Sequence, residues 1–247
     1  MVAASPAFAD GANATTVTVT PSHTSEISGQ PVSFRAQVVA VTPGTAKLTG
    51  AVTWTVTGND GTSVPCASEV PLTLGGRSVC KIAKSTLLAG NGPYTATAAY
   101  GGDANYTHSS GSLSLAVTPA TTNVKLSISA PPTNGAATVV TATLVGGPAT
   151  ALLTGTVVFT VTSGLHSPGV VVGCTGPATG KNSVLANDSV TLAGQVAVCN
   201  LPAGWMILPK ASTSNVHPSD TWSVSAIYVG NASFTFGRGV KAGTDKV

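Results

Sequence analysis

The chain has 247 residues, of which 43% are apolar and only 8% are charged, and its formal net charge is +3. The lysines and arginines are scattered, so the chain lacks the basic stripe typical of nucleic-acid-binding proteins. No apolar run approaches the length that a membrane-spanning helix needs. The abundance of Thr and Val favours strands, and the many Gly and Pro residues favour the turns between them.

The first residues resemble the end of a secretion signal. Ala7 and Ala9 are separated by one residue, which matches the small-residue pattern at a signal-peptide cleavage site. The basic and long apolar regions that precede such a site are absent from this sequence. We therefore expect residues 1–14 to form an N-terminal tail, either a signal-peptide remnant or a disordered segment rich in alanine.

Residues 15–118 are predicted to form a first domain made of strands. Apolar and polar side chains alternate over residues 32–38, 52–57 and 94–100, and a period of two buries one face of each strand. Turns rich in Gly, Pro and Asn separate these segments, and no segment shows sustained helical spacing. Several short strands separated by turns are typical of a β-sandwich.

Residues 119–247 repeat the same pattern and are predicted to form a second domain. Leu48 aligns with Leu153 at an offset of 105, whereas Tyr94 aligns with Trp222 at an offset of 128. The growing offset indicates insertions in the second copy.

The insertions are expected at about residues 163–188 and between residues 204 and 222. A short Pro-containing linker at residues 117–122 separates the two copies and favours a semi-rigid, extended pair. The sequence therefore predicts an all-β chain with two tandem sandwiches in an extended arrangement.

A stretch from Tyr94 to Tyr106 carries the most specific motif, Tyr-Gly-Gly-Asp-Ala-Asn-Tyr, at its end. Further motifs lie at residues 15–19, 29–34 and 48–52. On these residues the first copy resembles the bacterial immunoglobulin-like domains that recur in long surface and secreted repeat proteins. In the second copy the resemblance is diluted, and the turn motif becomes Gly-Asn-Ala-Ser-Phe.

The resemblance implies two tandem immunoglobulin-like Greek-key β-sandwiches and an extracellular setting. It also implies a role as a spacer, stalk or adhesive module, and this family has no catalytic residues to carry over to this chain. Fold analogy alone does not fix a function.

The four cysteines occupy equivalent places in the two copies, one pair in each. This predicts two disulfides, Cys66 with Cys80 and Cys174 with Cys199. Such bonds persist only in an oxidising compartment. Zinc sites need closely spaced ligands and usually nearby histidines, but no C-x-x-C pair is present and the histidines are isolated, so no metal site is expected.

No catalytic motif is present. The eight carboxylates are spread along the chain, and neither G-x-S-x-G nor H-E-x-x-H occurs. Residues 176–182 resemble a phosphate-binding loop, but Thr175 replaces its first glycine and Asn182 replaces its final Ser or Thr. We expect no catalytic residues, no cofactor and no enzyme activity.

Asp103 in the Gly-Gly-Asp-Ala-Asn turn has two alternative interpretations. Its oxygens could contribute to a Ca²⁺ site, but calcium takes about six to eight oxygen ligands, usually from several carboxylates. Asp and Asn in turns more often hydrogen-bond their own backbone, and this structural role is the one we expect.

One insertion of the second copy contains a run of apolar residues that the first copy lacks, namely Trp205, Met206, Ile207 and Leu208. The run could fold over the end of its own core. Alternatively, it forms an exposed patch that binds a protein or a surface glycan, with Trp205 as the main anchor.

The C-terminal segment lacks the alternating apolar residues of the first copy's last strand. Residues 240–245 read Val-Lys-Ala-Gly-Thr-Asp and predict a poor strand. An unpaired sheet edge in the second domain would be a template for strand addition by another copy, with residues 1–20 as the donor. The alternative is simply a weak terminal strand.

The leading functional hypothesis is a non-catalytic, secreted or cell-surface module with a structural or adhesive role. It would act as a stalk, a spacer, or a subunit of a surface coat or fibre. The alternative is a module that binds a glycan or a protein through the Trp205 loop. Neither nucleic acid nor a membrane span is expected.

Overall fold

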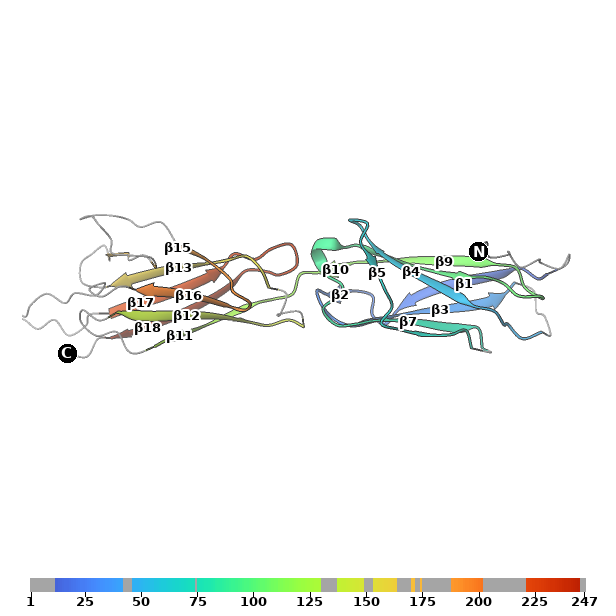
Figure 1. Ribbon diagram of the computed structural model, residues 1–247, viewed down its shortest axis with the longest axis horizontal. Helices are drawn as coiled ribbons and strands as arrows, with labels where there is room; N and C mark the ends of the chain where they lie inside the picture. The colour runs from blue at the N-terminus through green and yellow to red at the C-terminus, as the bar shows by residue number, and fades with distance from the viewer. Residues whose placement is uncertain are drawn as a thin grey trace, which may run out of the picture. The chain divides into compact units, whose positions relative to one another are not determined.

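The computed structural model describes residues 12–41, 46–73, 75–129, 137–148, 153–163, 170–171, 174, 188–201 and 221–244. The chain divides into two compact units, unit 1 (Met1–Pro119) and unit 2 (Ala120–Val247) (Figure 1). The division lies within the linker expected from the sequence. The possible signal-peptide residues, among them Ala7 and Ala9, lie outside the described residues.

Unit 1 consists of two antiparallel sheets packed face to face (Figure 1). The first sheet has the order β1 (Thr15–Pro21), β3 (Val32–Ala40), β7 (Arg77–Ile82), β6 (Ser68–Val70). The second has the order β5 (Ser63–Val64), β4 (Val52–Gly58), β8 (Tyr94–Tyr100), β9 (Ser109–Leu115). A short parallel pair, β2 (Glu26–Ile27) with β10 (Val117–Thr118), and one 3₁₀ turn, η1 (Ala89–Asn91), complete the unit.

The core of unit 1 forms from the alternating apolar residues of these strands. In β3, Phe34 and Ala36 are buried, whereas Arg35 between them is exposed. Trp54 of β4 and Tyr94 of β8 approach from the second sheet and join the same buried cluster. The period-two pattern therefore places one face of each sheet against the other, as predicted.

Unit 2 repeats the arrangement of two sheets, but one of its strands pairs in the other sheet. Its first sheet has the order β11 (Asn123–Ile128), β12 (Thr138–Val145), β16 (Val196–Leu201). Its second sheet has the order β14 (Val170–Val171), β13 (Thr156–Ser163), β17 (Thr221–Tyr228), β18 (Gly237–Thr244). The strand β15 (Asp188–Thr191) pairs with β13, whereas its counterpart β6 pairs with β7 in the opposite sheet.

The strand order identifies both units as immunoglobulin-like sandwiches. Each unit has two sheets of three or more strands, and several neighbouring strands in these sheets are distant in the sequence. This is the arrangement of the Greek-key immunoglobulin-like fold. The chain is therefore all-β, with two tandem immunoglobulin-like sandwiches, as the sequence predicted.

The prediction that the C-terminal segment forms a poor strand is wrong. β18 pairs with β17 over its whole length, from Tyr228 opposite Gly237 to Thr221 opposite Thr244. The inward-facing position of Gly239 needs no apolar side chain, because a Cβ atom there would lie only 2.5 Å from the carbonyl oxygen of Val124 in β11. Close contact with the β11 backbone thus replaces the missing apolar alternation.

Unit 2 therefore has a last strand, and the reason for expecting an unpaired edge in its place no longer holds. Addition of a strand from a second copy at the edge of unit 2 stays a prediction, and its expected donor, residues 1–20, lies mostly outside the described residues.

Candidate functional site

The two disulfides lie at the predicted cysteines, one in each unit. Cys66 is bonded to Cys80 with an S–S distance of 2.00 Å, and Cys174 is bonded to Cys199 with an S–S distance of 2.05 Å. In each unit, the bond joins a loop to a strand of the first sheet. Cys66 and Cys174 lie in the connections that follow β5 and β14, which are outer strands of the second sheet. Their partners are buried in β7 and β16. Antibody domains instead place their disulfide between the two sheets at strands B and F.

Asp103, the residue considered for calcium, is a structural residue of its turn. Its Oδ1 accepts hydrogen bonds from the backbone N–H groups of Asn105 at 2.8 Å and Tyr106 at 2.9 Å. Its Oδ2 accepts hydrogen bonds from the backbone N–H and the hydroxyl of Thr49, both at 2.7 Å. The hydroxyl of Tyr100 lies 3.1 Å from the same oxygen and 2.7 Å from the carbonyl oxygen of Thr49.

These donors occupy both carboxylate oxygens and point hydrogens at the place where a cation would bind. Partial burial by itself would raise the pKa of Asp103, but the hydrogen bonds from Thr49 and Asn105 outweigh burial and hold the pKa below its usual value. Burial and the neighbouring carboxylate raise the pKa of Tyr100, which keeps its hydroxyl protonated as a donor. Among the described residues, no three His, Cys, Asp or Glu side chains group as metal ligands.

Unit 2 builds the same turn with an amide in place of the carboxylate. Oδ1 of Asn231 accepts hydrogen bonds from the N–H groups of Ser233 at 2.8 Å and Phe234 at 3.0 Å. The hydroxyl of Tyr228 donates to the carbonyl oxygen of Thr154 at 2.9 Å, as Tyr100 does to Thr49. The motif that carries the family resemblance is therefore a device that fixes the turn between the last two strands.

A second duplicated arrangement, which we call the strand clamp, joins the start of each unit to the segment that leads into its last strand. In unit 1, the N–H of Asn13 donates to the carbonyl oxygen of Asn105 at 2.8 Å, and its carbonyl oxygen accepts from the N–H of Thr107 at 2.9 Å. The hydroxyl of Thr15 donates to the carbonyl oxygen of Thr107 at 2.9 Å and lies 2.6 Å from the hydroxyl of Ser109. The paired segments run parallel.

The clamp of unit 2 repeats three of these bonds at equivalent positions, whereas Gly237 stands where unit 1 has Ser109. The N–H of Ala120 donates to the carbonyl oxygen of Ser233 at 3.0 Å, and its carbonyl oxygen accepts from the N–H of Thr235 at 2.9 Å. The hydroxyl of Thr122 donates to the carbonyl oxygen of Thr235 at 2.7 Å. The two clamps therefore repeat in detail, down to the threonine side chain.

A glycine lets the two clamped strands cross closely in each unit. A Cβ atom on Gly111 of β9 would clash with the carbonyl oxygen of Val17 in β1. Gly239 of β18 has the same relation to Val124 of β11. Only a residue without a side chain fits between these strands at either place.

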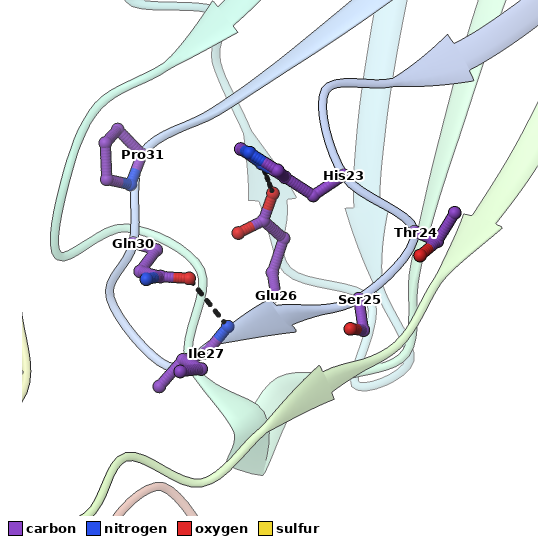
Figure 2. Close-up of a pocket in the computed structure, with 7 residues that line it drawn as sticks. All are labelled: His23, Thr24, Ser25, Glu26, Ile27, Gln30 and Pro31. Atoms are coloured by element: carbon purple, nitrogen blue, oxygen red, sulfur yellow. Dashed lines mark hydrogen bonds and ion pairs between the residues drawn. The ribbon is translucent and has the colours of Figure 1, made fainter.

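A hollow of about 510 Å³ lies at the end of unit 1 beside β2 (Figure 2). His23, Glu26, Gln30 and Pro31 surround it in Figure 2, and Ile27 forms part of its wall. Nδ1 of His23 donates to Oε1 of Glu26 at 3.0 Å, and the amide oxygen of Gln30 accepts from the N–H of Ile27 at 3.2 Å. Only 3% of Glu26 is exposed, whereas 69% of the His23 side chain is exposed.

The backbone around Glu26 is held by the β2–β10 pair. The N–H of Glu26 donates to the carbonyl oxygen of Ala116 at 3.4 Å, and its carbonyl oxygen accepts from the hydroxyl of Thr118 at 3.1 Å. Glu26 and His23 were not among the site residues predicted from the sequence. A signal was available, because a His and a Glu three residues apart are conspicuous in a chain with so few charges.

The predicted partner-binding residues Trp205, Met206, Ile207 and Leu208 lie outside the described residues, as do most of the two insertions. Elsewhere in unit 2, Ile227 of β17, Val240 of β18 and Phe236, which precedes β18, are exposed. The aligned positions of unit 1 carry the small or polar residues Ala99, His108 and Ser112. Unit 2 therefore exposes large apolar side chains at three positions where unit 1 has small or polar ones.

In the part of the chain that the structure describes, no helix has the length and apolar character needed to cross a bilayer. No family model matches the sequence, and no curated protein matches it either.

Several solved structures resemble the chain. A tetra-tandem repeat from the extending region of a large adhesion protein is 16% identical, with a TM-score of 0.44 over 95% of this chain. The adhesin InvE of Yersinia pseudotuberculosis is 12% identical, with a TM-score of 0.37 over 92% of this chain. The Escherichia coli adhesin FdeC is 13% identical, with a TM-score of 0.29 over 90% of this chain. The chain spans 50%, 58% and 62% of these three chains, respectively.

Proposed function

We propose that the chain is a non-catalytic extracellular module with a structural role, a stalk or spacer that carries tension at a cell surface or in a secreted assembly. The observation that supports this most directly is the strand clamp, which both units build with the same two backbone bonds and the same threonine hydroxyl bond. The two disulfides support the extracellular setting, because such bonds persist in oxidising compartments.

The clamp geometry suits a chain that is pulled from its ends. Asn13 enters unit 1 in parallel with the segment at Tyr106, so a pull on the two ends slides the strands along each other. Sliding loads all the hydrogen bonds of Asn13, Thr15 and Thr107 together, whereas peeling would break them one at a time. The same holds for Ala120 and Thr235 in unit 2.

Single-molecule pulling on the N- and C-termini of the whole chain tests this proposal. The expected result is two separate unfolding events. Each should require more force than unfolding the same unit by pulling on the two strands of a β-hairpin, a geometry in which the strands peel apart. Thr15→Ala should lower the force of one event and Thr122→Ala that of the other. The control Thr53→Ala changes an exposed threonine outside the clamp and should change neither event. Unfolding at equal force in both pulling geometries would overturn the proposal.

A second candidate function is a module that binds a protein or a surface glycan through the Trp205 loop. The observation that favours it is the apolar character that unit 2 acquires in its insertion and at the exposed residues Ile227, Phe236 and Val240, where unit 1 is polar or small. Trp205→Ala should abolish binding to the surface that the protein adheres to while leaving both unfolding transitions unchanged. Binding that survives this substitution rules out the loop as the site.

A further inference from the structure

The outer face of the first sheet of unit 1 carries a group of cations that are scattered in the sequence. Arg35 of β3 and Arg77 and Lys81 of β7 are exposed and alternate with buried neighbours, so all three point away from the core. Arg35 lies opposite Val79, and Arg77 and Lys81 stand two positions to either side of that partner. Diagonal neighbours in such a ladder are about 7–8 Å apart, so the three cations form a zigzag row, which we call the basic face.

The charges of the basic face are not compensated in the described part of the chain. None of the three cations pairs with a described carboxylate, and the side chains of Arg35 and Lys81 make no hydrogen bond there. The aligned positions of unit 2 hold the uncharged residues Thr141, Val196 and Asn200. The fold itself therefore does not require charge at these places, and the basic face is a property of unit 1 alone.

Arg77 is held in an orientation that leaves its terminal donors open. Its Nε donates to Oε1 of Gln37 at 3.1 Å. The amide nitrogen of Gln37 donates in turn to three backbone carbonyl oxygens, those of Gly75 at 2.9 Å, Val38 at 3.2 Å and Gly76 at 3.3 Å. A guanidinium has five N–H donors, and among the described residues only the Nε–H is used, so both terminal NH₂ groups remain for a ligand.

The terminal NH₂ groups of an arginine suit a carboxylate. Two parallel N–H groups in one plane match the two oxygens of a planar carboxylate, which gives short, charge-assisted hydrogen bonds. Because Gln37 already orders the side chain of Arg77, less side-chain entropy is lost when a ligand binds. The further charges of Arg35 and Lys81 favour a ligand that repeats its negative charge along a chain over a single small anion.

The side chains beside the cations suit a sugar chain better than a protein surface. Thr18 lies directly opposite Gln37 and is exposed. Ser33 lies directly opposite Lys81. Their hydroxyl groups both donate and accept hydrogen bonds, as sugar hydroxyls do. Protein interfaces are instead built around a core of apolar and aromatic residues, whereas the residue between the three cations is the half-buried Val79.

We infer that the basic face is a binding site for an acidic glycan, with one carboxylate of the glycan held by both terminal NH₂ groups of Arg77 and further carboxylates beside Arg35 and Lys81. Gln37 is a positioning residue in this site, because it acts on the ligand through Arg77. The site depends neither on the strand clamp nor on the Trp205 loop, so it and the functions proposed above fail separately.

The test is a titration of the whole chain with hexagalacturonate, a sugar chain with one carboxylate on each residue, followed by ¹H–¹⁵N NMR. The expected result is saturable shifts at the Nε–H of Arg77 and at the backbone amides of β3 and β7. The methyl ester of the same oligosaccharide, which lacks the charges, should produce no saturable shift.

Capped hexaglutamate separates a glycan site from a site for acidic peptides. It should bind at least about fivefold more weakly than hexagalacturonate, because it lacks the sugar hydroxyls, a loss equivalent to about one hydrogen bond. Absence of saturable shifts with hexagalacturonate in the wild-type chain would overturn the assignment, with no variant needed. Binding of hexaglutamate at equal or higher affinity would overturn the choice of a glycan.

Variants with matched controls sharpen the result, and the same spectra show whether each is folded. Arg77→Lys keeps the charge but loses the paired donors and should weaken hexagalacturonate binding about tenfold. Its control, Arg238→Lys, changes an exposed arginine of β18 and should leave binding unchanged. Lys81→Gln should also weaken binding, whereas Lys125→Gln, which removes an exposed charge from unit 2, should not.

The role of Gln37 has its own readout. Gln37→Ala should weaken binding in the wild-type chain but should have no further effect in Arg77→Lys, which has no Nε to hold. Equal weakening in both backgrounds would show that Gln37 does not act through Arg77. Unchanged binding in Arg77→Lys, or weakening by either control substitution, would contradict the site itself.

Discussion

The indole N–H of Trp54 donates a hydrogen bond to the hydroxyl of Ser78 at 3.0 Å across the buried space between the two sheets of unit 1. The equivalent positions of unit 2 are Phe159 and Ala197, as the strand registers show. Donor and acceptor are thus both present in one unit and both replaced by apolar groups in the other. This is the pattern expected when an unpaired buried donor is costly but an apolar pair is not.

Replacing only one partner should therefore destabilise unit 1. Ser78→Ala leaves the Trp54 N–H buried without this acceptor, and we expect a loss of about 1–2 kcal/mol in the free energy of unfolding. The double variant Trp54→Phe/Ser78→Ala, which copies unit 2, should lose about 1 kcal/mol less than the sum of the single variants. Denaturant unfolding of the four proteins gives the coupling energy, and strict additivity would contradict the pairing.

The close strand crossings predict a unit-specific effect of alanine substitution. Gly111→Ala should destabilise unit 1 by about 2–3 kcal/mol, because the added Cβ forces β9 away from β1. Gly239→Ala should do the same to unit 2. Gly101→Ala is the matched control, since its Cβ would meet nothing nearer than 3.8 Å. Hydrogen exchange measured by mass spectrometry separates the two units, and equal losses in both units from one substitution would count against this explanation.

The Asp103 turn predicts an acid-sensitive contribution that only unit 1 has. Because the folded pKa of Asp103 is lowered, its stabilisation is fully present above the unfolded pKa of about 3.9 and is lost as the pH falls through the folded value. Asp103→Asn should therefore cost about 1 kcal/mol at neutral pH, a figure that allows for solvent screening. The difference from the wild-type chain should disappear in strong acid.

Denaturant unfolding monitored from pH 7 to pH 2 checks this prediction. Unit 2, which has Asn231 at this position, serves as the internal reference. A difference between Asp103→Asn and the wild-type chain that is independent of pH would show that the charge of the carboxylate has no part in the stabilisation.

Removing the disulfides should cost slightly more in unit 2 than in unit 1. The bonded cysteines are 14 residues apart in unit 1 and 25 apart in unit 2. Loop-closure entropy then gives losses of about 3 and 3.5 kcal/mol for the paired substitutions Cys66→Ala/Cys80→Ala and Cys174→Ala/Cys199→Ala. Calorimetry of the two variants against the wild-type chain measures both losses, and an effect confined to one unit would mean that the other bond is dispensable.

Much of the fold could be predicted from the sequence because its signals are local. Alternation in segments such as residues 32–38 defines which side chains of a strand are buried, and the duplicated motifs reveal that the pattern occurs twice. The cysteines could be paired because they occupy equivalent places in both copies. The role of Asp103 was also foreseeable, since it depends on its own turn and on nearby backbone.

The features that the sequence did not reveal depend on contacts between distant segments. β18 pairs with β17 and crosses β11 closely where Gly239 meets Val124, more than a hundred residues earlier, and no pattern within residues 237–244 records that contact. The burial of Glu26 likewise involves the pairing of β2 with β10, two strands that lie far apart in the sequence. The sequence by itself therefore determined the strands and their repetition, whereas the tertiary structure decided which backbones cross closely and which charge is buried, because close packing and burial are properties of distant segments brought together.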